Sequence, residues 1–522
     1  MKDTMNGAEA LLKTLIDSGV EVCFANPGTS EMQLVAAIDK IPGMRPVLGL
    51  FEGVVTGAAD GYGRMADKPA ATLLHVGSGL ANGMANLHNA KRARTPIVNM
   101  IGDHATYHLP LDAPLTSDVP TAAGLTTDWM RVCESTENMG NHAAEAVAAS
   151  IHGRQANLVV PADLAWTEGG HVAAPIEPKP REQVDQLAIE RCAELLLHEN
   201  SCLFLGGISL RDRGLTAAKR IQNASGAELI HENAPARVQR GAGRPTVERL
   251  PYLAEIAVER LEKFDHMVLA GAKAPVAFFA YPNLPGELTK PDCVIHTLAA
   301  PEQDVIAAIE VLADYIEGKG KSTNPETQDR KAQDLPEIPA GKVTAQGVGA
   351  AVANLLPRDA IISDEAITSG AFFYDYFDEA ACHDWLNLTG GAIGQGLPLA
   401  IGAAVACPDR KVISLQADGS AMYTNQALWT MARENLDVCV VLFNNSRYAI
   451  LELEFSRVGV QNPGERARSM LDIGTPVIDW CQIATGMGVK AGKAETMAEF
   501  RHLFEEAMAT EGPRLIEVVL TS

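Results

Sequence analysis

Two short polar segments, 27 residues apart, carry the most specific chemistry in this sequence. Asp418 lies shortly after the apolar run 411–415, and Asn445 lies shortly after the apolar run 438–443. Each run is typical of a buried strand, and the residues between the runs predict a helix. Parallel strands end at one edge of a sheet, so we expect Asp418 and Asn445 to lie together there. Carboxylate and amide oxygens both suit Mg²⁺, which predicts a magnesium site.

The turn between the first strand and the helix adds a possible anion site. Gly419 lets the backbone approach an anion closely, and a helix that begins near Ser420 would point its N–H groups at it. An ordinary turn with an N-cap aspartate would explain Asp418 alone. The paired asparagines at 444–445 are harder to explain as a turn, so we favour a metal and phosphate site.

This pattern resembles the diphosphate-binding motif of thiamine diphosphate-dependent enzymes. That motif has an acidic residue and a glycine, a helix, and then two asparagines; the family usually has glycine where this chain has Ala417. The resemblance implies that Asp418 and Asn445 bind Mg²⁺ through their side chains and Arg447 through its backbone carbonyl. It also implies that Gly419 and Ser420 contact the diphosphate.

Glu52 lies between an apolar strand and a helix of small residues. Such a position also fits a surface carboxylate stabilised by the helix dipole. The segment 51–64, however, resembles the family's catalytic-glutamate segment. The resemblance implies a buried acid that hydrogen-bonds a pyrimidine nitrogen of the cofactor and promotes the imino tautomer, whose nitrogen takes the proton from the thiazolium carbon. That role requires a carboxylic acid held away from water.

Further cofactor contacts are implied by two Gly-containing segments. The segment 390–394 follows a predicted strand and could be a plain turn, but in the family this position carries two cofactor contacts. By resemblance, Gly391 supplies a carbonyl to the cofactor's amino group, and Ile393 supports the bent cofactor conformation. Thr368 and Ser369 match hydroxyls that contact the diphosphate, although a helix cap explains them equally well.

The resemblance is strongest to benzoylformate decarboxylases and to acetolactate-synthase-like proteins, most clearly over 5–105 and 385–520. It implies that Thr29 corresponds to a substrate-contacting hydroxyl residue and His75 to one of two active-site histidines. Histidine titrates near neutral pH, so His75 would be suited to proton transfer. A structural role for His75 is an equal alternative.

Two departures from the family pattern concern the substrate. The decarboxylase's second histidine has no counterpart in 275–282, which argues against benzoylformate itself. Pyruvate decarboxylases have an acidic residue where this chain has Leu451, which argues against their pocket. His104 and His108 follow a strand end and could line the pocket; as a metal site, the pair lacks a visible third ligand.

Composition sets the broad class. The 522 residues are 47% apolar and 21% charged, which predicts a globular protein of about three domains. The net charge of −22 argues against nucleic acid or an anionic membrane as partner. Nine cysteines lack paired spacing, and no apolar run has the length of a membrane span. We therefore expect a cytoplasmic protein with reduced thiols.

Alternating strand and helix patterns predict an α/β protein with three doubly wound, parallel-sheet domains. We expect an N-terminal pyrimidine-binding domain (1–166), a central domain (182–316), a linker (317–342) and a C-terminal domain that binds diphosphate and Mg²⁺ (343–522). The segments 73–78 and 415–420 each join a strand end to a Gly/Ser turn. This similarity indicates that the first and last domains use one layout twice.

These observations predict an enzyme that uses thiamine diphosphate and Mg²⁺ to decarboxylate a 2-oxo acid without oxidation. A carboligase of acetolactate-synthase type is the main alternative, and an inactive structural or regulatory homologue is another. Gly206-Gly207 lacks a GxGxxG pattern, so we expect no FAD, with a non-redox nucleotide site left open. The resemblance implies active sites between the first domain of one chain and the last of another, and hence a homodimer or homotetramer.

Overall fold

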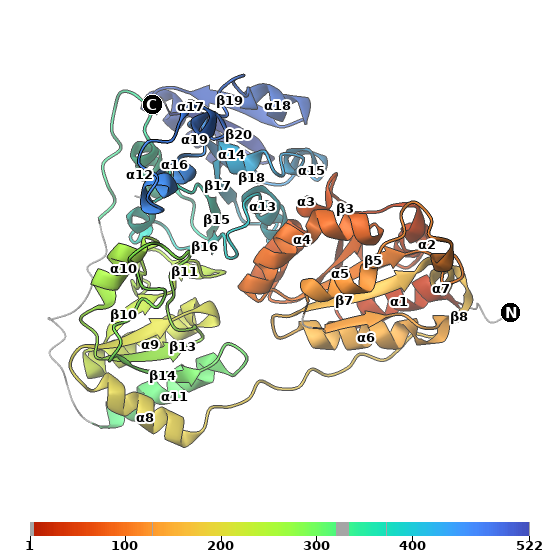
Figure 1. Ribbon diagram of the computed structural model, residues 1–522, viewed down its shortest axis with the longest axis horizontal. Coiled ribbons are helices and arrows are strands. Elements are labelled where there is room, and N and C mark those ends of the chain that lie inside the picture. The colour runs from red at the N-terminus through yellow and green to blue at the C-terminus, as the bar shows by residue number, and fades with distance from the viewer. Residues whose placement is uncertain (1–4, 128, 320–333, 372, 521–522) are drawn as a thin grey trace.

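The computed structural model describes residues 5–127, 129–319, 334–371 and 373–520. Three sheets with parallel strands organise these residues into an N-terminal, a central and a C-terminal domain. In Figure 1 the N-terminal domain (red to orange) lies beside the C-terminal domain (cyan to blue), and the central domain (yellow to green) lies below the latter. The predicted fold class is confirmed. Within the expected linker, residues 320–333 lie outside the described part of the chain.

The N-terminal sheet has six parallel strands in the order β3-β2-β4-β5-β7-β6. Its strands are β2 (Val22–Asn26), β3 (Arg45–Leu48), β4 (Ala70–Leu74), β5 (Ile97–Asp103), β6 (Trp129–Val132) and β7 (Gln155–Pro161). Its helices are α1 (Gly7–Asp17), α2 (Met32–Lys40), α3 (Glu52–Ala66), α4 (Val76–Ala93), α5 (Val119–Leu125), α6 (Met139–Ser150) and α7 (Ala162–Trp166), with 3₁₀ turns η1 (Thr29–Glu31), η2 (Leu109–Leu111) and η3 (Thr136–Asn138). A separate antiparallel pair joins β1 (Met5–Asn6) to β8 (Glu168–Gly170).

The central sheet has five parallel strands in the order β12-β10-β9-β13-β14. Its strands are β9 (Ser201–Leu205), β10 (Glu228–His231), β12 (Glu248–Arg249), β13 (His266–Ala270) and β14 (Val294–Ala299). Its helices are α8 (Gln186–Leu196), η4 (Gly207–Leu210), α9 (Asp212–Ser225), α10 (Ala254–Leu261) and α11 (Val305–Gly318). Between β10 and β12, the short strand β11 (Val238–Arg240) leaves this sheet and pairs antiparallel with the C-terminal sheet.

The C-terminal sheet has the order β11-β16-β15-β17-β18-β20-β19 and is parallel apart from β11. Its other strands are β15 (Ala360–Glu365), β16 (His383–Asn387), β17 (Val412–Ala417), β18 (Val438–Asn444), β19 (Lys490–Ala494) and β20 (Arg514–Val519). Its helices are α12 (Ala345–Leu355), η5 (Tyr374–Phe377), α13 (Gly396–Ala406), α14 (Asp418–Ala421), α15 (Ala427–Arg433), α16 (Ala449–Arg457), α17 (Glu465–Ser469), α18 (Trp480–Gly486) and α19 (Met497–Ala509). The single helix expected after Asp418 is therefore two short helices, α14 and α15.

The N-terminal and C-terminal sheets share one strand order. Reading from β3 in the first sheet and from β16 in the second, each strand has a counterpart of the same rank along the chain. Thus β4 corresponds to β17, and β5 corresponds to β18. The duplicated layout expected from the sequence is present, and it places equivalent strand ends in equivalent positions.

The two domains meet through α3 and α13, which are counterparts in this layout. Both helices contain glycines where their backbones approach each other. A Cβ atom at Gly61 would lie 2.0 Å from the Leu399 carbonyl oxygen, and one at Gly402 would lie 1.8 Å from the Ala58 carbonyl oxygen. A side chain at either position would push the helices apart, so the small residues of α3 set the distance between the domains.

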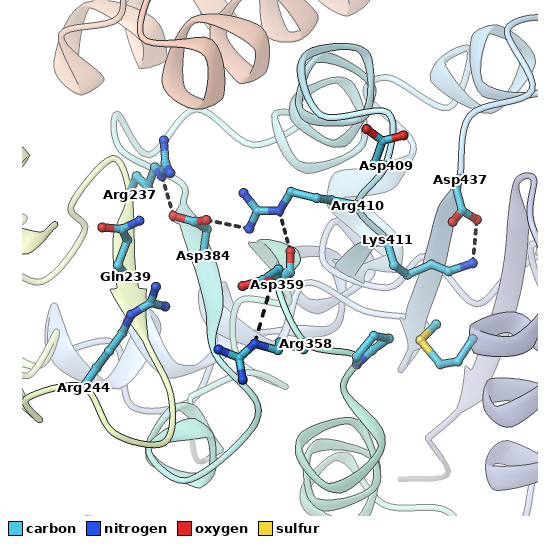
Figure 2. Close-up of a pocket in the computed structure, with 12 residues that line it drawn as sticks. Arg237, Gln239, Arg244, Arg358, Asp359, Asp384, Asp409, Arg410, Lys411 and Asp437 are labelled. Carbon is cyan, nitrogen blue, oxygen red and sulfur yellow. Dashed lines mark hydrogen bonds and ion pairs between the residues drawn. The ribbon is translucent and has the colours of Figure 1, made fainter. Parts of the chain in front are cut away.

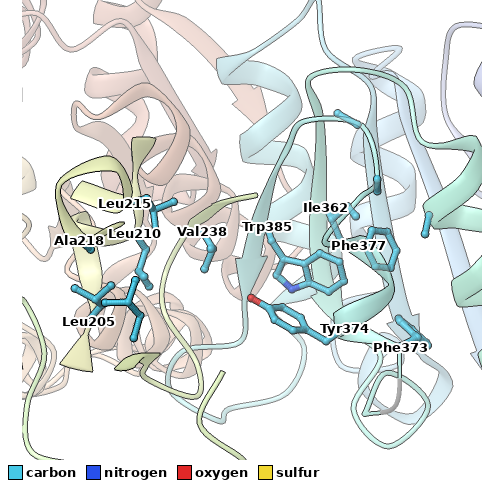
Figure 3. Packing of buried hydrophobic residues seen from close by; sticks show 14 of the residues in the cluster. Leu205, Leu210, Leu215, Ala218, Val238, Ile362, Phe373, Tyr374, Phe377 and Trp385 are labelled. Carbon is cyan, nitrogen blue, oxygen red and sulfur yellow. The ribbon is translucent and has the colours of Figure 1, made fainter. Parts of the chain in front are cut away.

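The central and C-terminal domains share a continuous apolar core (Figure 3). Val238 of β11 lies between Leu210 and Leu215 of the central domain and Trp385 of β16. All four side chains are buried. Their burial keeps apolar area from water across the domain boundary, which stabilises the contact between the two domains. No helix in the described residues is both long and apolar enough to span a bilayer.

Candidate functional site

Asp418 and Asn445 are brought together as the sequence predicted. Each directly follows its strand, and β17 and β18 are neighbours, with Ala417 opposite Phe443. The Asp418 carboxylate accepts hydrogen bonds from the Gly419 N–H at 2.8 Å and the Ser446 N–H at 2.7 Å. The Ser446 bond fixes the aspartate against the loop that carries Asn445.

The chemistry of this pair fits a divalent cation. Asp418 is 2% exposed, and burial raises the pKa of its carboxyl although backbone N–H groups oppose the rise. Across the described residues, no lysine or arginine forms an ion pair with it. A buried carboxylate without a cationic partner is costly, and a bound Mg²⁺ would offset that cost. The side-chain oxygen of Asn445 accepts one bond, from the Arg447 N–H at 3.1 Å, which leaves it a second lone pair.

Hydrogen bonds to backbone carbonyl groups hold the turn that contains Gly391 and Ile393. His88 contacts the Gly390 carbonyl at 3.1 Å, and Asn89 donates to the Ala392 carbonyl at 2.7 Å. Within the described chain, the Gly391 carbonyl between them accepts no hydrogen bond. Gly391 has φ +76° and is exposed, so its carbonyl is available to a ligand. Ile393 is half-buried in the same turn.

Glu52 is buried at the first position of α3, with 5% of its surface exposed. Its carboxylate accepts a hydrogen bond from Asn82 of α4 at 3.0 Å. A Cβ atom at Gly79 would lie 2.8 Å from the other carboxylate oxygen, so α4 approaches Glu52 closely because of that glycine. The alternative of a solvated surface carboxylate is therefore wrong. In the part of the chain described, no hydrogen bond joins Glu52 to Asp418 or Asn445.

His75 is paired with a carboxylate that the sequence did not single out. It directly follows β4, and its Nδ1 lies 2.8 Å from Oε2 of Glu31, a fully buried residue. The same oxygen accepts the Gly28 N–H at 2.7 Å. The buried carboxylate orients the imidazole and favours the tautomer with its proton on Nδ1. The only local sign of Glu31 was its position three residues after Gly28, from which its side chain can accept the Gly28 N–H.

The remaining predicted residues lie at the same sheet edges. Thr29 is exposed in η1, and His104 follows β5 with its ring 5.6 Å from that of His108. Thr368 and Ser369 follow β15 in a turn. Leu451 is 45% exposed in the first turn of α16.

Three non-glycine residues beside predicted site residues have left-handed backbone conformations. Val76 (φ +43°) follows His75, Ile367 (φ +50°) precedes Thr368, and Ser446 (φ +57°) follows Asn445. Such conformations are costly, above all for β-branched side chains, and are found preferentially at functional sites. Each of the three lies shortly after the carboxyl-terminal end of a strand.

A cavity of about 560 Å³ lies at the opposite edge of the C-terminal sheet (Figure 2). It is lined by residues at the amino-terminal ends of the strands, including Asp359, Lys411 and Asp437. Figure 2 shows Asp384 between the guanidinium groups of Arg237 and Arg410, with which it forms ion pairs. The charged side chains that line the cavity are largely paired with one another. The cavity is remote from the turns that follow β17 and β18.

Comparison with known proteins identifies the family of this chain. Two family models match: "Thiamine pyrophosphate enzyme, N-terminal TPP binding domain" over residues 5–122 and "Thiamine pyrophosphate enzyme, C-terminal TPP binding domain" over residues 368–518. A protein of Mycobacterium tuberculosis named "Putative acetolactate synthase large subunit IlvX" is 49% identical over 523 residues and covers 99% of both chains. The chain belongs to the thiamine pyrophosphate enzyme family.

More distant relatives bear the names of decarboxylases. Benzoylformate decarboxylase of Pseudomonas aeruginosa is 28% identical and covers 96% of each chain. Among solved structures, the thiamine diphosphate-dependent 4-hydroxybenzoylformate decarboxylase of Rhodococcus jostii RHA1 superposes with a TM-score of 0.84 at 24% identity, over 99% of each chain. The structural likeness supports the fold, and the decarboxylase and acetolactate synthase names define the part of the family to which this chain is similar.

Proposed function

We propose that this protein is a thiamine diphosphate- and Mg²⁺-dependent enzyme that decarboxylates a 2-oxo acid without oxidation. The observation that carries the proposal is the buried Asp418 carboxylate, which has no cationic partner among the described residues and is held beside Asn445 at the carboxyl edge of the sheet. A magnesium-bound diphosphate at this edge would satisfy both residues.

The C-terminal domain would hold the cofactor. Asp418, Asn445 and the Arg447 carbonyl would bind Mg²⁺. Gly419, whose N–H donates to Asp418, would let the diphosphate approach the backbone, and the N–H group of Ser420 would contact it. Thr368 and Ser369 add hydroxyl groups at the neighbouring strand end. The free Gly391 carbonyl would accept a hydrogen bond from the amino group of the cofactor's pyrimidine ring, with Ile393 supporting its bent shape. When bound, thiamine diphosphate supplies the electron sink for carbon–carbon bond cleavage.

The N-terminal domain would supply proton transfer. Glu52 is buried and so can share a proton with a weakly basic ring nitrogen. His75 is partly exposed, with 23% of its side chain accessible, and its Nε2 faces away from Glu31. It would deliver a proton at Nε2 while Glu31 holds Nδ1, and Thr29 would bind the substrate carboxylate.

The two sets of residues belong to different domains, so the complete site requires their apposition. We propose a homodimer, or a tetramer of two dimers, in which Glu52 of one chain faces the Asp418 turn of another. Retention of one cofactor per chain only in the dimer would support this arrangement. A monomer with full activity would contradict it.

The proposed reaction is tested by product analysis. The protein, loaded with thiamine diphosphate and Mg²⁺, would be incubated with pyruvate and with branched and aromatic 2-oxo acids, with and without an acceptor aldehyde. Release of CO₂ and an aldehyde supports the decarboxylase. A protein that retains the cofactor but turns over no 2-oxo acid is instead an inactive homologue.

A carboligase of acetolactate-synthase type is the second candidate, and two observations favour it. The 49% identical relative carries that name, and the segment 275–282 has no histidine to donate a proton. Phe278 from that segment lies against the Gly391 turn, where a Cβ atom would meet its ring at 2.5 Å. An apolar wall there would favour addition to a second carbonyl over protonation. Formation of a 2-hydroxy ketone or 2-hydroxy-2-alkyl 3-oxo acid instead of free aldehyde would identify the carboligase.

A further inference from the structure

Glu365 is a buried carboxylate that the proposed mechanism does not use. It is the last residue of β15, 1% exposed, and lies among backbone N–H groups of the turn that leads into α13. Its Oε1 accepts the Gly394 N–H at 2.7 Å and the Gln395 N–H at 3.1 Å, and its Oε2 accepts the Gly396 N–H at 2.8 Å. Three consecutive amides therefore point at one side chain.

The same carboxylate reaches the metal turn. The Gln416 side-chain amide lies 2.8 Å from Oε2 of Glu365 and 2.7 Å from the Ser420 hydroxyl. Ser420 belongs to α14, which begins with Asp418. Glu365 is thus connected on one side to the turn of Gly391 and Ile393, and on the other to the helix that carries Asp418.

The packing around Glu365 is tight, and position 396 has no space for a side chain. A Cβ atom at Gly396 would lie 2.4 Å from Oε1 of Gln416 and 2.8 Å from Cβ of Glu365. Burial raises the pKa of the Glu365 carboxyl, while its four donors oppose the rise by stabilising the charged form. A carboxylate that is costly to bury is retained here at the centre of a hydrogen-bond network.

We propose that Glu365 is a positioning residue, which sets the Gly391 carbonyl and Ile393 relative to the metal turn so that both engage one cofactor. The proposal rests on the proposed function of these turns. Glu365 itself touches neither the substrate nor the cofactor; it acts by fixing the amides of 394–396 and, through Gln416, the orientation of Ser420.

Glu365→Gln tests the proposal because it keeps the size of the side chain and replaces one of the two accepting carboxylate oxygens by an NH₂ group. Whichever way the amide faces, its NH₂ group meets N–H donors. Losing hydrogen bonds to a charged group corresponds to about 10- to 100-fold in an equilibrium constant. We expect the amides of 394–396 to exchange about 10- to 100-fold faster in the cofactor-free protein, measured by hydrogen–deuterium exchange. We also expect thiamine diphosphate to bind more weakly by a similar factor in a titration.

The matched control is Glu232→Gln. Glu232 is also a carboxylate whose pKa is raised by burial, and it accepts the Gly207 N–H at 2.9 Å, but it lies in the central domain. The Glu232→Gln variant should leave hydrogen–deuterium exchange at residues 394–396 unchanged. If Glu365→Gln does not fold, Glu365→Asp keeps the charge, withdraws it by one methylene and should give the same local loss.

Two outcomes would overturn the proposal. Unchanged exchange at 394–396 in the folded variant would show that Glu365 does not fix the turn. Faster exchange over the whole C-terminal domain, with unchanged cofactor affinity, would show a merely structural role. A wild-type protein that binds no thiamine diphosphate would overturn the proposed function and, with it, the cofactor part of the proposal, whereas the exchange measurement is made without the cofactor.

Discussion

The N-terminal and C-terminal domains use the same strand order and present different chemistry at equivalent strand ends. His75 follows β4, and Asp418 follows the corresponding strand β17. His104 follows β5, and Asn445 follows β18. One domain thus offers imidazoles, which can donate or accept protons near neutral pH, whereas the other offers hard oxygen ligands.

The shared layout fixes where functional groups appear, and the residue type at each strand end fixes what they do. Strained backbone accompanies the strand ends in both domains, at Val76 in the first and at Ser446 in the second. The counterpart helices α3 and α13 also present different chemistry at their amino-terminal ends. One begins with the buried acid Glu52, and the other follows a turn in which the Gly391 carbonyl accepts no hydrogen bond from the described residues. Proton transfer and cofactor retention should therefore be separable by mutation.

The largest expected effect is in the C-terminal domain. Asp418→Ala should abolish Mg²⁺-dependent retention of thiamine diphosphate, weakening it by more than about 100-fold, because even outer-shell changes at metal sites cost 10- to 100-fold. Equilibrium dialysis with and without Mg²⁺ measures this loss. His75→Ala, at the corresponding strand end, should retain the cofactor. Normal retention by Asp418→Ala would show that the two edges do not differ as proposed.

The next effect separates binding from proton transfer. Glu52→Gln should retain the cofactor, while exchange of the C2 proton of the bound thiazolium ring slows by about 10²- to 10⁴-fold, the usual range for loss of a general acid–base group. Acid-quenched exchange in D₂O, followed by NMR, measures the rate. Unchanged exchange would remove Glu52 from its proposed role.

A smaller effect is expected at the His75–Glu31 pair. His75→Ala should lower kcat for 2-oxo acid turnover by about 100-fold and leave cofactor affinity unchanged, because the proposed role of the imidazole is confined to proton transfer. Glu31→Gln should have a smaller effect in the same direction, since the imidazole loses its orientation but not its presence. Equal kcat values for His75→Ala and the wild type would favour the structural alternative for this histidine.

Much of this arrangement could be predicted because it is local. The apolar runs 411–415 and 438–443 predict the strands that end at Ala417 and Asn444, and the predicted doubly wound topology puts Asp418 and Asn445 at one sheet edge. The duplicated layout was also visible from the similar strand ends. The roles of Glu52 and Gly391 came from a family resemblance, and they remain predictions.

Other features could not be predicted because they depend on distant contacts. Glu31 and His75 are 44 residues apart, and Glu365 meets the 394–396 amides only after the sheet has formed. Likewise, three residues at Val238–Arg240 leave the central sheet to extend the C-terminal one, a pairing with no local signal. The helix expected after Asp418 is interrupted between α14 and α15, a break that the helical pattern of the sequence did not indicate.

The smallest expected effect is on the stability of the cofactor-free protein, and it depends on pH. Burial raises the folded-state pKa of Asp418 above its ordinary value of 3.8, so the folded state binds the proton more tightly than the unfolded state does. Stability should therefore fall as pH rises from 3.8 through the raised pKa and stay lower above it. Asp418→Asn removes the ionisation, so this variant should unfold at a higher temperature than the wild type at pH 7, and the difference should shrink as the pH approaches 4.

With Mg²⁺ and thiamine diphosphate present at pH 7, the wild type should instead unfold at a higher temperature than Asp418→Asn. Under the proposed function, Mg²⁺ would bind the ionised carboxylate of the folded wild type and hold the diphosphate there. This would raise the unfolding temperature of the wild type, whereas the asparagine variant would gain little. Thermal unfolding is followed by circular dichroism at pH 4 to 8, with and without both ligands. The crossing to be measured is the change in which protein, wild type or Asp418→Asn, has the higher unfolding temperature. Asp409→Asn, at an exposed carboxylate of the same domain, should give no crossing. If Asp418→Asn were less stable than the wild type without ligands, the buried carboxylate would be stabilised by the protein itself, and the contrast between the two sheet edges would no longer require a metal.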